Sequence, residues 1–142
     1  PQESAHGQLL NVLSAYGLPL GEAFQLRDDL LGVFGDPATT GKPAGDDLRE
    51  GKRTVLLAMA MERASDAART ELATHLGDPE LSSEKIDSLR SLIIETGAVD
   101  EVEKLIDRLG EESTAAAQST AIAEGAHPFL LALAETAIRR SY

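Results

Sequence analysis

The spacing of apolar residues constrains the fold of this chain more than any other feature, because it follows a helical period almost throughout. Helix-forming residues dominate, and no segment alternates apolar and polar residues with the Val, Ile and aromatic enrichment of a β-strand. A chain of 142 residues is long enough to bury one ordinary core. The sequence therefore predicts an all-α fold and a single domain over residues 1–142.

Caps and helix breakers divide this pattern into elements. The predicted helices span residues 4–16, 19–35, 54–64, 66–76, 82–95, 100–121 and 128–140. Gly17-Leu18-Pro19 is expected to end or kink the first of them. Residues 36–52 combine prolines and glycines with charges, so they read as a long loop, which is usually functional or disordered. The Ala- and Thr-rich run 113–123 indicates either close helix packing or fraying.

Composition excludes several classes of function. The net charge is −11, which disfavours binding to a phosphate backbone, so nucleic acid is not an expected partner. There is no cysteine, and hence no disulfide, thiolate metal site or Cys nucleophile. No apolar run approaches the roughly 18 residues of a membrane-spanning helix, and no signal peptide is visible. The expected location is the cytoplasm.

Charged residues gather where the chemistry is expected. Residues 27–53 hold five basic and six acidic side chains, whereas the rest of the chain is strongly acidic. Gln25, Asp28 and Asp29 share one stripe of an otherwise apolar helix. Such carboxylates suit Mg²⁺ or Mn²⁺, and Lys42 and Lys52 can reach a phosphate on the same ion. On composition alone an equally good interpretation is that the two aspartates face solvent or pair with nearby arginines, Arg27 and Arg53.

The residue pattern of this region favours the interpretation that the two aspartates bind a metal ion. The sequence GEAFQLRDDLLGVFGDP (21–37), then TGKP (40–43) and GDDLREGKRT (45–54) closely resembles the second aspartate-rich region of the trans-isoprenyl diphosphate synthases. Within that family these motifs are most similar to those of the geranylgeranyl and longer-chain bacterial branch. The resemblance implies the all-α isoprenoid synthase bundle, with this chain as its C-terminal part.

The resemblance also implies a reaction and roles. In this family Mg²⁺ holds an allylic diphosphate between two aspartate-rich helices, the C–O bond ionises, isopentenyl diphosphate attacks the cation, and a proton is lost. By similarity Asp28 is a Mg²⁺ ligand, Asp29 a second or supporting one, and Asp46 a loop aspartate near the metal. Gln25 is expected to contact the diphosphate, Lys42 to bind it and Lys52 to lie near it. The full-length protein is expected to be a homodimer.

Two departures from the family pattern have consequences. Gly32 stands where the family usually has a third aspartate, four residues after Asp28. We expect that loss to be mild, and Gly32→Asp to stabilise the helix slightly. The first aspartate-rich motif and the isopentenyl diphosphate site are absent from these 142 residues, so the chain alone is expected to be inactive.

Other interpretations have less support in the sequence. The main rival is a non-catalytic, prenyltransferase-like helical subunit for regulation or interaction; a terpene cyclase is more distant, because its metal motifs differ. Glu71 and His75 are expected to form a surface pair rather than a di-metal site. No functional role is assigned to His6 or His127. Gly41-Lys42 lacks the rest of a P-loop.

Overall fold

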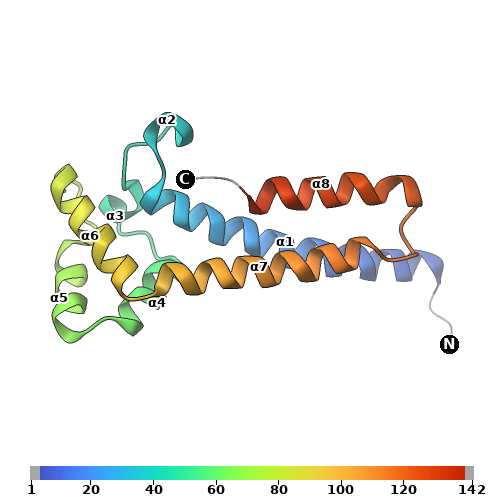
Figure 1. Ribbon diagram of the computed structural model, residues 1–142, viewed down its shortest axis with the longest axis horizontal. Coiled ribbons are helices and arrows are strands. Elements are labelled where there is room, and N and C mark those ends of the chain that lie inside the picture. The colour runs from blue at the N-terminus through green and yellow to red at the C-terminus, as the bar shows by residue number, and fades with distance from the viewer. Residues whose placement is uncertain (1–3, 140–142) are drawn as a thin grey trace. The chain divides into compact units, whose positions relative to one another are not determined.

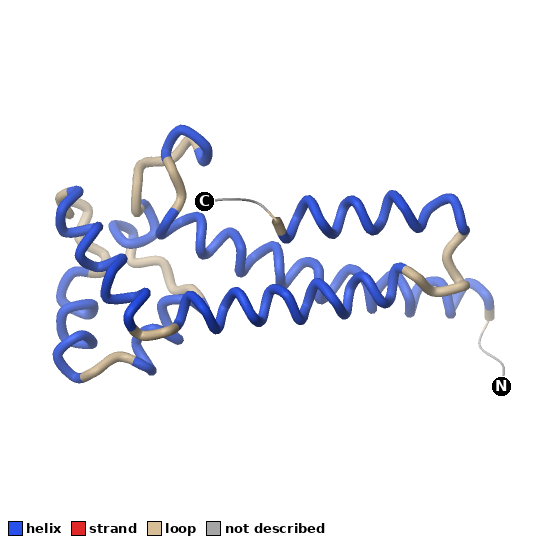
Figure 2. The backbone as a smooth tube through the Cα atoms, viewed as in Figure 1, coloured by secondary structure: helices blue, strands red, loops and turns tan. Residues whose placement is uncertain are grey.

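The computed structural model describes residues 4–139, and within that range every regular element is a helix (Figures 1 and 2). This confirms the all-α prediction. The elements are α1 (Ala5–Phe34), α2 (Pro37–Thr40), α3 (Asp46–Glu50), α4 (Val55–Arg63), α5 (Asp66–His75), α6 (Ser83–Glu95), α7 (Ala98–Ala117), the 3₁₀ helix η1 (Glu124–Ala126) and α8 (His127–Ile138). None of the helices between residues 4 and 139 has the length and apolar character that crossing a membrane requires.

Two compact units divide the described residues. The terminal unit comprises residues 4–25 and 104–139, and the central unit comprises residues 26–103. Helices α1 and α7 each contribute residues to both. The single domain expected over 1–142 stays a prediction.

Helix α1 is continuous, so the helix end expected at residues 17–19 was wrong, while a kink there stays a prediction. Pro19 lies inside the helix, where it removes one backbone donor and normally bends or ends a helix. In the same turn, the Ser113 hydroxyl on α7 donates a hydrogen bond to the Tyr16 carbonyl at 2.8 Å. The Tyr16 hydroxyl in turn donates to the Leu130 carbonyl on α8 at 2.8 Å. Tertiary hydrogen bonds within the terminal unit therefore hold the turn that the sequence marks as weak.

The core of the terminal unit is apolar and closely packed. A Cβ placed on Gly110 of α7 would lie 2.6 Å from Cδ1 of Ile138 on α8, so glycine permits a close approach of these helices. The Ala- and Thr-rich run packs through Ser113 and Ala117, both fully buried, and the helix then ends at Ala117 rather than at the expected residue 121. The buried apolar residues here are Tyr16, Leu20, Ala23, Ile106, Leu109, Ala117, Ile122, Ala134 and Ile138.

The core of the central unit gathers leucine and isoleucine side chains from α1 and α3 to α7. Its largest fully buried members are Leu30, Val33, Leu48, Leu56, Leu72, Ile86, Leu89, Ile93 and Val102. Phe24, which precedes this unit on α1, is 45% exposed. One side of α1 is therefore exposed to solvent, and polar side chains can lie there.

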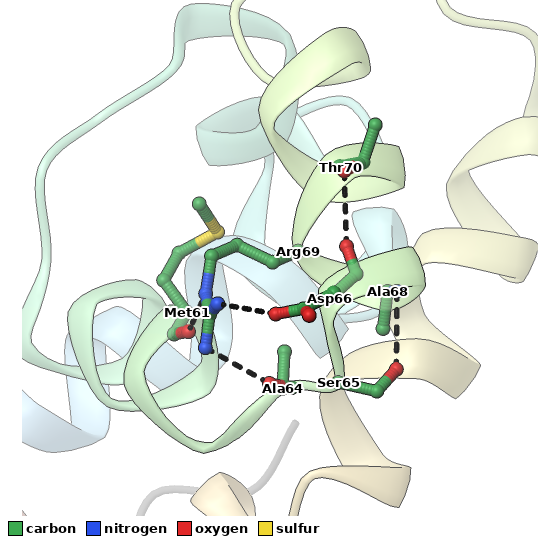
Figure 3. A network of polar contacts seen from close by, with 7 residues as sticks. All are labelled: Met61, Ala64, Ser65, Asp66, Ala68, Arg69 and Thr70. Atoms are coloured by element: carbon green, nitrogen blue, oxygen red, sulfur yellow. Dashed lines mark hydrogen bonds and ion pairs between the residues drawn. The ribbon is translucent and has the colours of Figure 1, made fainter.

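Arg69 closes the turn between α4 and α5 (Figure 3). Its Nε donates to the Met61 carbonyl at 2.9 Å, Nη2 to the Ala64 carbonyl at 3.0 Å, and Nη1 to Asp66 at 3.1 Å. The carbonyls at the C-terminal end of α4 have no helical partner of their own. One guanidinium thus satisfies two of them and fixes the direction of α5.

Several predicted boundaries were close and a few were wrong. Caps at Thr54, Ser65 and Ser82 begin α4, α5 and α6, and each hydroxyl accepts a backbone hydrogen bond. The predicted loop 36–52 contains two short helices, α2 and α3, which glycines permit. Helix α7 begins at Ala98, two residues early, and α8 begins at His127. The basic end expected at residues 139–140 lies partly outside the described residues.

Candidate functional site

The last turns of α1 place the predicted aspartates in the central unit. Asp28 is half-buried, its side chain 34% exposed, and Asp29 is buried. The exposed Gln25 precedes them on the same helix, within the terminal unit. The buried Arg27 makes two hydrogen bonds to Glu103 of α7, at 2.7 and 2.9 Å. This bidentate pairing ties the end of α1 to α7.

The end of α1 is tied to α6 by Arg90. Its Nε donates to the Val33 carbonyl at 2.6 Å, one of the terminal carbonyls for which the helix itself has no donor. No basic residue lies in the last turn of α1 itself. A cation from another helix therefore caps the end of α1 that carries Asp28 and Asp29.

Segment 36–52 is held in place at its second half. Arg49 donates from Nη1 to the Ala44 carbonyl at 2.6 Å and from Nε and Nη2 to the Leu81 carbonyl at 3.3 and 3.2 Å. Gly51 ends α3 with φ +66°, and a Cβ there would lie 2.9 Å from the Cα of Gly77. Glycine is required at Gly51 both for its backbone angle and for this contact. These contacts fix the position of the next residue, Lys52.

Lys52 joins the two elements of the site. Its Nζ lies 3.9 Å from Asp28 Oδ2 on α1 and 3.8 Å from Asp47 Oδ2 on α3. Both distances exceed that of a hydrogen bond, so the ammonium group sits between the carboxylates with its donors open to another acceptor. The predicted residues Asp28 and Lys52 are thus brought together by the fold.

Sequence reasoning missed Asp47, whose side chain is only 5% exposed. Burial raises the pKa of the Asp47 carboxyl above its usual value; the charges of Lys52 and Lys42 oppose that rise, and those of Glu50 and Asp28 add to it. Its Oδ2 accepts no hydrogen bond from any described group. A buried carboxylate oxygen in this state is costly unless a cation or donor completes it.

The predicted ligand Asp46 lies beside Asp47 in the first turn of α3. One carboxylate oxygen from each of Asp46, Asp47 and Glu50 falls within a group no more than 4.8 Å across. Asp46 is half-buried and Glu50 is exposed. The sequence offered two adjacent aspartates with no indication of which one turns inward; the fold turns Asp47 toward Lys52.

Lys42 remains on the surface. It is exposed, and its backbone N–H donates to Thr40 Oγ1 at 3.2 Å in the turn after α2. Its charge acts on the Asp47 carboxyl, as the pKa of that group shows. No ion pair of its ammonium group with a described residue is found, so Lys42 is available to an anion from solution.

The space beside Gly32 is taken by Asp47. A Cβ on Gly32 would lie 2.0 Å from Asp47 Oδ2, far inside any van der Waals contact. A side chain at position 32 therefore requires the Asp47 carboxylate to move, and the expected effect of Gly32→Asp stays a prediction. A glycine inside a charged helical stripe, where it costs about 1 kcal/mol relative to alanine, was the one sequence signal that another group needs this space.

The donors present suit a hard divalent cation. They are carboxylate oxygens from α1 and α3, among them the buried Asp47 Oδ2 that accepts no hydrogen bond from the described residues. Oxygen donors of this kind favour Mg²⁺, Mn²⁺ or Ca²⁺ over softer metals. Two lysines beside them add positive charge for an anionic ligand. The protein is all-α, and its central unit brings carboxylates and lysines together.

Comparison with known proteins identifies the family. The polyprenyl synthetase family model matches residues 3–93, and the chain belongs to that family. A crystal structure of geranylgeranyl pyrophosphate synthase from Corynebacterium glutamicum, in complex with isoprenyl diphosphate and magnesium, matches with a TM-score of 0.89 and 49% identity, over 94% of this chain and 38% of that one.

Two sequence relatives agree. Geranylfarnesyl diphosphate synthase of Aeropyrum pernix is 39% identical over 70% of this chain and 30% of its own length. Geranylgeranyl diphosphate synthase of Mycobacterium tuberculosis is 29% identical over 96% of this chain and 38% of its own. The matched regions therefore cover only 30–38% of the length of these two relatives. The resemblance to isoprenyl diphosphate synthases and the isoprenoid synthase fold are confirmed.

Proposed function

We propose that this chain provides one metal–diphosphate half-site of a prenyltransferase that condenses isopentenyl diphosphate with an allylic diphosphate. The product is a longer, geranylgeranyl-type isoprenyl diphosphate. By half-site we mean the carboxylates and lysines that bind the allylic diphosphate. The observation that carries the proposal is the position of Lys52, within 4 Å of both Asp28 and Asp47. Family membership, and the ligands of the Corynebacterium enzyme, support it.

Each site residue has a role in this proposal. Asp28, Asp29 and Asp46 hold Mg²⁺. The Gln25 amide donates to the diphosphate. Lys42 and Lys52 approach the phosphate oxygens as point charges. When bound, Mg²⁺ supplies positive charge that offsets the charge on a departing diphosphate.

The reaction breaks the allylic C–O bond, and its electron pair leaves with the diphosphate. The double bond of isopentenyl diphosphate then forms the new C–C bond, and a proton departs to regenerate an alkene. Within this chain, the Lys42 and Lys52 ammonium groups face the leaving group as it gathers negative charge. Lys52 can turn toward it because neither of its two ion pairs has hydrogen-bond length.

A binding experiment tests the half-site directly. Titration calorimetry of the 142-residue chain with inorganic pyrophosphate should show binding that requires Mg²⁺ and that EDTA abolishes. Lys42→Ala should weaken it about tenfold or more, since a charge-assisted contact contributes about 1.5–3 kcal/mol. The matched control is Lys104→Ala, which removes an exposed lysine of the terminal unit. Pyrophosphate binding that needs no Mg²⁺ and is not weakened by Lys42→Ala would refute the half-site.

The chain alone should elongate no allylic substrate, because the first aspartate-rich motif is not among its residues. A radiolabelled isopentenyl diphosphate assay checks this, with the whole enzyme as positive control. If the whole enzyme bound pyrophosphate but showed no turnover, the non-catalytic subunit would replace the synthase. Homodimerisation and cytoplasmic location are further proposals for the whole protein, to be measured by light scattering and by cell fractionation.

A further inference from the structure

Helix α3 is too short to hold its own orientation. It has five residues, little more than one turn, and isolated helices of this length are not stable in water. Its orientation is therefore set by contacts with other elements of the central unit. That orientation matters because Lys52 follows α3 by two residues, and its backbone N–H donates to the Asp47 carbonyl at 3.1 Å.

Two residues join α3 to the turn between α5 and α6, which we call the α5–α6 turn (residues 76–82). The backbone N–H of Gly77 donates to the Leu48 carbonyl at 2.9 Å. Arg49 donates from Nε and Nη2 to the Leu81 carbonyl at 3.3 and 3.2 Å. Because Leu48 and Leu81 are themselves buried, water is a poor substitute for either donor.

The backbones of α3 and the α5–α6 turn also come close together at two glycines. A Cβ on Gly51 would lie 2.9 Å from the Gly77 Cα and 3.2 Å from the Gly77 nitrogen. Gly77 itself has φ +89°, a left-handed angle that favours glycine. The backbone immediately before Lys52 is thus in contact with a turn that lies much further along the chain.

The ammonium group of Lys52 is placed by its backbone more than by its ion-pair partners. Its Nζ lies 3.9 Å from Asp28 Oδ2 and 3.8 Å from Asp47 Oδ2, and both distances are longer than a hydrogen bond. Ion pairs of this length, made by a side chain that is 38% exposed, hold a lysine only weakly. A shift of α3 would therefore carry the ammonium group away from Asp28.

We propose that Arg49 and Gly77 are positioning residues for diphosphate binding. They hold α3 against the α5–α6 turn and so place the Lys52 ammonium group beside Asp28, without touching the ligand themselves. This inference rests on the proposed function for the identity of the ligand and for the role of Lys52. It adds that a turn outside the half-site determines how tightly the half-site binds diphosphate.

A double-mutant cycle with Lys52 tests the positioning role. Titration calorimetry measures inorganic pyrophosphate binding to the 142-residue chain with Mg²⁺. Lys52→Ala should weaken binding about tenfold or more. Arg49→Met should weaken it about threefold or more, but by no more than Lys52→Ala does. In the Lys52→Ala background Arg49→Met should change the affinity less than about 1.5-fold, because no ammonium group remains to be misplaced. Arg49→Lys, which keeps a donor and the charge, should lie between wild type and Arg49→Met.

Arg69→Met is the matched control. Arg69 lies in the same unit and closes the α4–α5 turn in the same way, by donating to the Met61 and Ala64 carbonyls (Figure 3). Its loss removes the same charge and comparable hydrogen bonds from a turn that does not carry Lys52. Arg69→Met should leave pyrophosphate affinity within about 1.5-fold of wild type. Equal weakening by Arg49→Met and Arg69→Met would mean a general loosening of the unit and would overturn the proposal.

A second pair of variants changes no charge. Gly77→Ala strains the α5–α6 turn through its positive φ, and should weaken pyrophosphate binding about threefold when Lys52 is present and less than about 1.5-fold when it is not. Its control is Gly97→Ala, at another helix end of the central unit with φ +81°, which should leave the affinity unchanged. This pair separates positioning from a long-range effect of the Arg49 charge.

The cycle also separates failure of this inference from failure of the proposed function. If Lys52→Ala weakens binding but Arg49→Met and Gly77→Ala do not, or if they weaken it equally with and without Lys52, the positioning role is overturned and the half-site stands. If Lys52→Ala leaves the affinity unchanged, or if no Mg²⁺-dependent binding occurs, the proposed role of Lys52 fails and the positioning role fails with it.

Discussion

The central and terminal units bury different kinds of polar group. In the central unit the buried set includes three charged side chains, Arg27, Asp29 and Asp47, whereas in the described part of the terminal unit it consists of Ser113. A buried hydroxyl with one good hydrogen bond costs little, but a buried charge costs several kcal/mol unless it is well paired. Of these three, Arg27 is paired with Glu103, whereas Asp47 Oδ2 accepts no hydrogen bond from the described residues, so the burial of Asp47 is the costly feature of the central unit.

The two units also differ in what their glycines make room for. Gly110 in the terminal unit admits the apolar end of Ile138, and Gly32 in the central unit admits the carboxylate of Asp47. The first contact improves helix packing. The second brings an ionisable group into the interior. A glycine that makes room for another side chain thus improves packing in the terminal unit and places a charged group in the interior of the central unit.

The largest expected effect contrasts one aspartate from each unit. In the whole enzyme, Asp28→Ala should lower turnover about 100-fold or more. The substitution removes a carboxylate proposed to hold Mg²⁺, and the positive charge of Mg²⁺ stabilises the leaving diphosphate. Its circular dichroism should be unchanged. Asp107→Ala, an exposed aspartate on α7 of the terminal unit, should leave turnover within twofold. A near-normal rate for Asp28→Ala at saturating Mg²⁺ would remove the distinction between the units.

A second expected effect concerns the buried charge that does have a partner. Arg27→Met should lower the free energy of unfolding by about 1.5–3 kcal/mol, because it removes two charge-assisted hydrogen bonds to Glu103. Urea denaturation measures it. The exposed Arg108→Met should change stability by no more than about 0.5 kcal/mol. Equal effects would show that Arg27 contributes no more than a surface charge.

In the terminal unit the corresponding effect is smaller. Tyr16→Phe should cost about 0.5–1.5 kcal/mol by removing the hydrogen bond to the Leu130 carbonyl. Burial also raises the pKa of the Tyr16 hydroxyl above the usual value for tyrosine, 10.0. Its contribution is therefore complete below pH 10 and is lost as the pH rises through the folded-state pKa. Denaturation at alkaline pH should show this loss in the wild type and not in Tyr16→Phe.

The smallest effect is expected at the surface of the central unit. The hydrogen bond from Lys85 lowers the pKa of the Glu71 carboxyl below the usual value for glutamate, 4.5. Its stabilising contribution is then present above pH 4.5 and is lost as the pH falls through the lowered value. Glu71→Gln should flatten this part of the acid unfolding profile slightly. A profile unchanged by the substitution would mean that the Lys85 contact does not persist in solution.

Much of this protein follows from local sequence. Helix formers, serine and threonine caps and the absence of strand patterns determined the all-α class and most helix starts, because these signals act within one or two turns. The surface pair was equally local: His75 Nε2 lies 3.4 Å from Glu71 Oε1. The carboxylates of α1 and the lysines after it were also readable, because motif spacing places them on one stripe or one short segment.

Tertiary structure decided the rest, because the deciding contacts join residues far apart in the chain. Pro19 stays inside α1, in the turn where Ser113, 97 positions from Tyr16, donates to the Tyr16 carbonyl. Choosing Asp47 over Asp46 depends on how α3 is turned against α1, which no helical period reports. Position 32 looked like a missing ligand in the sequence, and only the fold shows that the space beside Gly32 is filled by the carboxylate of Asp47.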